Sequence, residues 1–321
     1  MGTAEIVALC MNPALDITTG TDVVRPTDKL RCAVPRYDPG GGGINVALVA
    51  EALGTPAAAV FPAGGPAGEL VYSLLVAEGL AVHRVPIGGA TRESFTVNET
   101  STRKQYRFVL PGPQLTIAEQ TECLLALRRL AADARIVAAS GSLPPGVPDD
   151  YYQQVSMVCA ELGATFLLDT SGGGLRHIKS GVFLLKPSIR ELREDVGANL
   201  STEAEQIAAA RGLVNRGIAC HVLVSMGAQG ALLVSADEAC RLAAVDVPPG
   251  SGVGAGDAML AGVAVGIARG WAVTEAARLG IAAGAAMLLT PGTAPCTAED
   301  TERLFRQTGE PVPVTPTGRL E

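Results

Sequence analysis

Gly250-Ser251-Gly252-Val253-Gly254-Ala255-Gly256-Asp257 is the stretch around which the chain is organised, and it leads directly into the apolar run 258–268. Glycine at alternate positions adds nothing to a core, so we expect backbone that approaches a partner closely with its amides exposed. Where such a loop opens a helix, the first N–H groups lack intrahelical partners and form an anion site. Asp257 has two interpretations there. It is an ordinary helix cap, or it is a base that takes a hydroxyl proton while the amides hold developing negative charge.

A second glycine run, Gly40-Gly41-Gly42-Gly43-Ile44-Asn45, also opens an apolar helix, which we expect at 46–53, ending at Gly54. The amide of Asn45 both donates and accepts hydrogen bonds, which suits hydroxyl groups. Asp16 follows a predicted strand at 5–10, although a lone loop aspartate is more often solvated or part of a turn. The sequence therefore pairs one glycine loop that ends in an amide with another that ends in a carboxylate.

Composition narrows the class of protein. The chain has 321 residues, of which 48% are hydrophobic, 4% are aromatic and 38 are glycine, which suits helices packed tightly on a sheet. The net charge of −7 argues against electrostatic binding of nucleic acid or a membrane surface. The seven cysteines show no metal-ligand spacing, and residues 1–10 lack the features of a signal peptide. We therefore expect reduced thiols, no membrane span and a cytoplasmic location.

Short apolar strands alternate with helices along most of the chain, which predicts a parallel sheet covered on both faces. The expected strands are 57–62, 82–87, 134–139, 165–168, 181–185 and 221–225, and the expected helices are 68–78, 117–131, 149–162 and 202–217. A hairpin is expected at 230–234 and 241–247. Ligands of such sheets bind beyond the carboxyl ends of the strands. Asp16, Ser140, Asp169, Lys186 and Ser225 all occupy those ends.

One region has a different pattern. Residues 94–99 and 105–110 alternate polar and apolar side chains around a polar turn, which predicts a hairpin with one wet face. With residues 17–38 it would form a small antiparallel sheet that serves as a lid or a dimer surface. We accordingly predict an α/β catalytic domain from 1–15, 41–89 and 112–310, a lid from 16–40 and 90–111, and a mobile tail at 311–321.

Several common sites are excluded. There is no G-x-x-x-x-G-K-[ST] motif, and neither glycine run follows the first strand as a dinucleotide fingerprint requires. The three histidines are scattered, and no nucleophile elbow supports a serine triad. Catalysis by a metal held only by protein ligands has no support.

The two glycine stretches, 39–47 and 253–257, resemble the two signatures of the ribokinase-like (PfkB) carbohydrate kinases. The segments 29–32, 61–65, 106–109 and 140–146 resemble more narrowly the minor 6-phosphofructokinase branch, which neighbours the 1-phosphofructokinases and tagatose-6-phosphate kinases. The resemblance spans about residues 7–300. It implies a three-layer α/β/α fold with a β-sheet lid and ATP-dependent, Mg²⁺-assisted phosphorylation of a sugar phosphate, most simply fructose 6-phosphate, without a covalent intermediate.

The resemblance also implies site residues. Asp257 would be the catalytic base, with an anion hole at Gly254, Ala255 and Gly256. The sugar would contact Asp16, Gly41, Gly42, Asn45 and Ser140, and its phosphate Lys29, Arg92 and Arg107. The nucleotide would contact Lys186, Ser188, Ser225, Gly227, Gly230, Ser251 and Gly252. Glu191 would order Mg²⁺ through water, and some relatives bind a monovalent cation near 292–293. The lid sheets of the family pack together in homodimers, where Arg107 would reach the site of the neighbouring subunit.

The sequence departs from the family pattern at two positions. Ser188 stands where the family usually has asparagine, and Gly252 stands where it usually has threonine or a similar polar residue. Both changes affect the surroundings of the nucleotide phosphates. Three hypotheses remain: a fructose-6-phosphate kinase, a kinase for tagatose 6-phosphate or fructose 1-phosphate, and a catalytically weak regulator that binds sugar or nucleotide.

Overall fold

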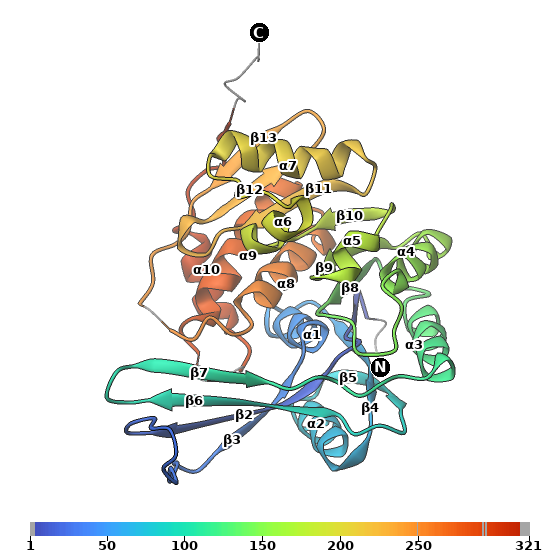
Figure 1. Cartoon of the computed structure of the whole chain (residues 1–321). Coiled ribbons are helices and arrows are strands. Elements are labelled where there is room, and N and C mark those ends of the chain that lie inside the picture. The colour runs from blue at the N-terminus through green and yellow to red at the C-terminus, as the bar shows by residue number, and fades with distance from the viewer. Residues whose placement is uncertain (1–3, 249, 291, 293, 315–321) are drawn as a thin grey trace.

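The computed structural model describes residues 4–248, 250–290, 292 and 294–314 (Figure 1). Within them the main sheet has ten strands. In spatial order these are β14 (Val312–Pro313), β13 (Ala239–Leu242), β12 (Ala231–Val234), β11 (Ala219–Ser225), β10 (Val182–Leu185), β9 (Thr165–Asp169), β8 (Ile136–Ser140), β1 (Ile6–Leu9), β4 (Ala57–Ala63) and β5 (Ala81–Pro86). The strands from β5 to β11 run parallel, and β12 to β14 extend the sheet antiparallel. The predicted parallel core is confirmed.

Helices cover both faces of this sheet, because its central strands are apolar on both sides; β4, for example, is buried along its whole length. One face packs against α1 (Gly42–Ala52), α2 (Gly65–Ala77), α8 (Ala255–Ala268), α9 (Val273–Met287) and α10 (Ala298–Phe305). The other packs against α3 (Ile117–Leu130), α4 (Tyr151–Leu162), α5 (Gly173–His177), α6 (Ile189–Val196) and α7 (Glu203–Asn215). The result is the expected three-layer α/β/α arrangement.

A separate four-stranded sheet lies across one end of the main body (Figure 1). Its order is β3 (Arg36–Gly40), β2 (Ala14–Thr21), β6 (Arg92–Glu99) and β7 (Lys104–Val109). It is not wholly antiparallel as predicted, because β2 and β6 run parallel. The reason is that β2 follows β1 and β6 follows β5, and both of these strands leave the main sheet in the same direction. We call this sheet the lid.

Several element boundaries differ from expectation. Helix α1 begins at Gly42, within the glycine run, and α8 begins at Ala255. Strand β13 ends at Leu242 rather than at 247, because the chain beyond it turns to line a cavity. Val312 pairs with Arg241 at the start of the predicted tail, whereas residues 315–321 lie outside the described residues. None of the helices in the described residues is long and apolar enough to cross a membrane.

Candidate active site

Asp257 lies in the first turn of α8, directly after the glycine loop. Asn45 Nδ2, in α1, donates to Asp257 Oδ2 at 2.9 Å, and Ser140 Oγ, at the end of β8, donates to Oδ1 at 2.8 Å. Both donors are almost completely buried. Three segments remote in sequence thus fix the carboxylate at both oxygens, which positions it to take a proton from a bound hydroxyl.

The glycines beside this carboxylate are required by close packing. A Cβ at Gly42 would lie 2.4 Å from Ser140 Oγ and 2.8 Å from Asp257 Oδ1. Gly254, which caps α8, has a φ of +77°, in the left-handed region that favours glycine. The expected close approach of backbone to functional groups is therefore present at Gly42, whereas Gly254 supplies a left-handed turn.

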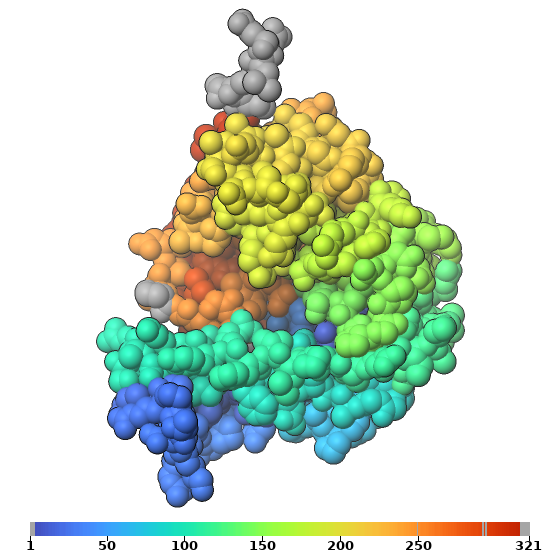
Figure 2. All heavy atoms as spheres, in the orientation of Figure 1, coloured from blue at the N-terminus to red at the C-terminus, as the bar shows by residue number. Residues whose placement is uncertain are grey.

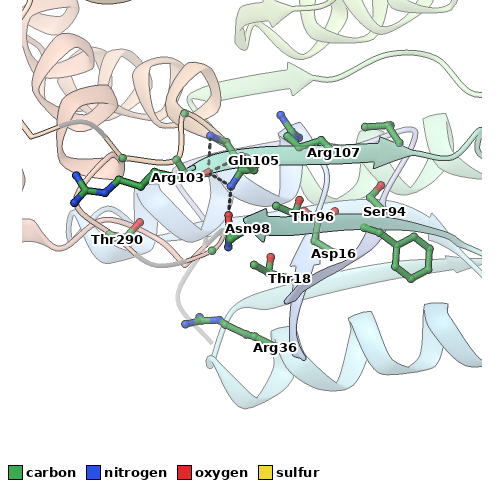
Figure 3. A pocket seen from close by; sticks show the side chains of 17 residues that line it. Asp16, Thr18, Arg36, Ser94, Thr96, Asn98, Arg103, Gln105, Arg107 and Thr290 are labelled. Atoms are coloured by element: carbon green, nitrogen blue, oxygen red, sulfur yellow. Dashed lines mark hydrogen bonds between the residues drawn. The ribbon is translucent and has the colours of Figure 1, made fainter. Parts of the chain in front are cut away.

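A cavity of about 690 Å³ lies between the lid and the loop 250–253. In Figure 2 the surface is hollowed between the green lid strands and the orange segment that holds this loop. Its lining residues are Asp16, Thr18, Arg36, Ser94, Phe95, Thr96, Asn98, Arg103, Gln105, Arg107, Val109, Gly250, Ser251, Gly252, Val253, Thr290 and Gly292 (Figure 3). We call it the lid cavity. Burial raises the pKa of Asp16 to about 6, although the charges of Arg107 and Arg92 act in the lowering direction.

The three cations predicted to hold the sugar's phosphate occupy different places. Arg107 lines the lid cavity. Arg92 uses its guanidinium on backbone carbonyls, with Asn12 at 2.9 Å, Leu110 at 3.2 Å and Pro13 at 3.4 Å. Lys29 is exposed in the connection between β2 and β3 and does not line the cavity.

Sequence reasoning missed two other arginines in the lid cavity, Arg36 and Arg103. Strand alternation could not have found Arg103, because it lies in the turn that precedes β7. Arg36 Nε forms an ion pair with Asp38 at 2.8 Å, so its charge is largely matched by a neighbour.

A second cavity, of about 730 Å³, lies on the other side of the glycine loop and is lined mostly by apolar residues. Its lining residues are Ser225, Gly227, Ala228, Ala244, Val245, Asp246, Val247, Gly252, Ala255, Gly256, Met259, Ile281, Gly284, Ala285 and Leu288. We call it the apolar cavity. Gly252 lines both cavities, so the loop forms the boundary between them.

Of the predicted nucleotide residues, Ser225 and Gly227 line the apolar cavity and Ser251 lines the lid cavity, whereas Lys186, Ser188 and Gly230 line neither. Gly230 has a structural role, because a Cβ there would lie 2.0 Å from the Leu242 carbonyl oxygen. Ser188 caps α6, and its N–H and hydroxyl both donate to Glu191 Oε2 at 2.8 Å. Glu191 is thereby fixed at the N-terminus of that helix.

Lys186 is buried and forms an ion pair with Asp169, at 2.7 Å between Nζ and Oδ2. Burial opposes the charge of Lys186, but the Asp169 carboxylate holds the pKa of Lys186 above its ordinary value. The pair lies next to Gly256, where a Cβ would be 3.4 Å from Nζ. The sequence predicted Asp169 at the end of a strand but did not predict its ion pair with Lys186. Among the described residues, no group of three or more His, Cys, Asp or Glu could hold a metal ion.

Residues 6–300 match the pfkB family carbohydrate kinase model. The chain belongs to this family. The pfkB kinase is 58% identical over 313 residues to ATP-dependent 6-phosphofructokinase isozyme 2 of Mycobacterium tuberculosis (strain H37Rv), with 98% of this chain and 92% of that protein covered.

Two crystal structures of phosphofructokinase-2 from Escherichia coli resemble the kinase. One is a complex with potassium, with a TM-score of 0.90 and 36% identity, and the other is a complex with fructose-6-phosphate, with a TM-score of 0.88 and 35% identity. Each covers 95% of this chain and 99% of its own. The predicted family, ribokinase-like fold and phosphotransferase class are confirmed.

Proposed function

We propose that this kinase transfers the γ-phosphoryl group of ATP to a hydroxyl of fructose 6-phosphate, which gives ADP and fructose 1,6-bisphosphate. The main support is the position of Asp257, held at both oxygens directly after the loop that divides two cavities. The lid cavity, with Asp16 and Arg107, suits a sugar phosphate. The apolar cavity suits a nucleoside.

In this mechanism the hydroxyl oxygen of the sugar attacks the γ-phosphorus while Asp257 accepts the hydroxyl proton. The bond from phosphorus to the bridging oxygen breaks, and ADP leaves with that electron pair. The backbone amides of Gly254, Ala255 and Gly256 would stabilise charge on the transferring group, and that of Ala255 would exchange its 3.3 Å hydrogen bond to the Gly252 carbonyl oxygen for the phosphoryl group. The fixed donors Asn45 and Ser140 keep the carboxylate aimed at the acceptor.

The residues fit Mg²⁺ that arrives with the nucleotide. Mg²⁺ keeps several waters and binds substrate phosphates with one or two protein carboxylates, so a full protein cage is not required. Glu191, ordered by Ser188, would contact it through water and help to neutralise the phosphates. A monovalent cation near 292–293 also remains a proposal; of these residues, 293 lies outside the described residues.

The lid offers a surface for a homodimer. Tyr37, Ile17, Phe95 and Phe108 pair in register across all four strands, and Phe95 also lines the lid cavity. Three of them, Tyr37, Phe95 and Phe108, are exposed. An exposed apolar row of this kind favours association of two lids, and it supports the proposal that Arg107 reaches the neighbouring subunit's site. The seven cysteines carry free thiols, which supports a cytoplasmic location.

A coupled assay of ADP formation with fructose 6-phosphate, tagatose 6-phosphate, fructose 1-phosphate and free fructose tests the function. We expect the highest kcat/KM with fructose 6-phosphate. Preference for another phosphosugar would replace the acceptor, and preference for free fructose would refute the phosphate site. Failure of all four acceptors to stimulate ADP formation would leave the regulator hypothesis.

A further inference from the structure

The inner face of the lid is ordered from one end of the lid cavity to the other. Asp16 pairs in register with Ser94, which pairs with Val109. Arg107 pairs with Thr96 two residues further along, and Gln105 with Asn98 after that. Arg103 lies in the turn beyond, six residues from Val109, which corresponds to about 20 Å along an antiparallel strand. Arg103 is therefore at the opposite end of the cavity from the predicted sugar site at Asp16.

This far end of the lid meets the glycine loop. Gln105 and Ser251 approach to 3.4 Å between their side-chain polar atoms, and Gln105 Nε2 also donates to Asn98 at 3.0 Å (Figure 3). Arg103 lines the lid cavity together with Gly250, Ser251 and Gly252. Because Gly252 also lines the apolar cavity, the loop that Arg103 shares the lid cavity with separates it from the apolar cavity.

The charge of Arg103 has no protein partner within the described residues: no carboxylate lies within 4.0 Å of its guanidinium, and it makes no hydrogen bond there. The other cations near the loop differ. Lys186 is paired with Asp169, and Arg36 with Asp38. A Cβ built at Gly252 would meet no atom within 4 Å, so no side chain at that position separates the two cavities.

The backbone at Arg103 has a conformation that non-glycine residues seldom adopt. Its φ is +57°, in the left-handed region where glycine or asparagine is the residue usually found. An arginine in this turn carries a conformational penalty that glycine would remove. The side chain of Arg103 nevertheless lines the lid cavity (Figure 3).

We propose that Arg103 is a nucleotide-binding residue supplied by the lid, whose guanidinium contacts the phosphates of ATP where they pass Gly252 into the lid cavity. Arginine suits this task because its planar donors bind phosphate oxygens in pairs. The lid would then recognise both substrates, with Asp16 and Arg107 at the sugar and Arg103 at the phosphate donor. The inference rests on the proposed use of ATP.

The test compares R103G with K104A. Lys104 is a neighbouring exposed cation that does not line the lid cavity, so K104A controls for loss of one positive charge at this turn. The dissociation constant of ATP is measured by calorimetry without acceptor, which makes the result independent of the sugar. We expect R103G to weaken ATP binding about ten- to a hundredfold, the scale of a lost charge-assisted contact, and to raise Tm because glycine relaxes the turn. K104A should stay within about twofold.

An ATP dissociation constant for R103G within twofold of the native value would overturn the proposal. So would a rise in the KM of the sugar phosphate with unchanged ATP binding, because Arg103 would then belong to the acceptor site. If R103G lowers Tm, the turn has been damaged, and R103K must restore ATP binding for the proposal to stand. A native enzyme that binds ATP but phosphorylates none of the acceptors would refute the proposed function and leave this test intact.

Discussion

Replacing Gly42 by alanine should displace the catalytic carboxylate by direct steric contact. Gly42 begins α1, and its φ is not in the left-handed region, so alanine fits the backbone there. The added Cβ would lie 2.4 Å from Ser140 Oγ and 2.8 Å from Asp257 Oδ1. To reach ordinary contact, the hydroxyl must move by about 1 Å and the carboxylate oxygen by about 0.6 Å.

The displacement cannot be absorbed by backbone alone, because the Cβ would also lie 2.8 Å from the backbone carbonyl carbon of Ser140, in β8. A misplacement of 1 Å in a catalytic group costs about 10²-fold in rate, or about 2.7 kcal/mol in the barrier. We therefore expect kcat of G42A to fall about 10²-fold and its unfolding free energy to fall by about 1–3 kcal/mol, the usual cost of overpacking a buried site.

Initial rates with both substrates, together with urea unfolding, measure the two effects. The matched control is G212A in α7, where a Cβ would meet nothing within 4 Å, so kcat should stay the same. A kcat of G42A within threefold of the native enzyme would refute the reasoning, and so would an equal loss in the control.

Three further predictions follow from the carboxylates of the site. Asp257→Asn should lower kcat about 10²- to 10⁴-fold while ATP still binds; native turnover of this variant would remove Asp257 from its role as base. Because burial raises the pKa of Asp16 to about 6, the KM of the sugar phosphate should rise as pH falls from 7 to 5. In Asp16→Asn, the KM should keep only the pH dependence that comes from the substrate's own phosphate. Identical pH profiles of KM for this variant and the native enzyme would contradict a role for this carboxyl. The folded state also binds the Asp16 proton more tightly than the unfolded state does, so protonation of Asp16 stabilises the fold. This contribution is lost as pH rises through about 6. Asp16→Asn should therefore raise Tm at pH 8 but not below pH 4. Asp169→Asn should lower the unfolding free energy by about 3–5 kcal/mol, since it leaves the buried charge of Lys186 without its partner. If urea unfolding gives a free energy within about 1 kcal/mol of the native value, another group must compensate the charge of Lys186.

Much of the fold could be predicted from periodicity, because the buried parallel strands and their helices are written in runs of apolar residues. The short helix α6 was missed, since its amphipathic pattern spans only eight residues. Its capping box at Ser188 and Glu191 was nevertheless visible in the sequence. The parallel pairing of β2 with β6 depends on where β1 and β5 lie in the main sheet, which local pattern does not encode.

Site residues that belong to a sequence motif could be predicted, whereas contacts that depend on tertiary structure could not. Asp257 and Asn45 were named from their glycine loops. The hydrogen bond from Ser140 to Asp257 joins residues 117 positions apart, and it exists because β8 ends beside the N-terminus of α8. Arg92 was expected at a phosphate from the family resemblance; in the structure its guanidinium donates to the backbone carbonyls of Asn12, Pro13 and Leu110.

The two-residue strand β14 has a consequence for how the main sheet ends. Val314 N donates to the Ala239 carbonyl oxygen at 2.9 Å, so by the alternation of an antiparallel ladder Val312 also faces β13. The outward positions are then Pro311 and Pro313, which have no N–H to donate. A further strand arriving at this edge would find acceptors without donors. Proline at both outward positions thus protects the open side of the sheet from pairing with other chains and from aggregation.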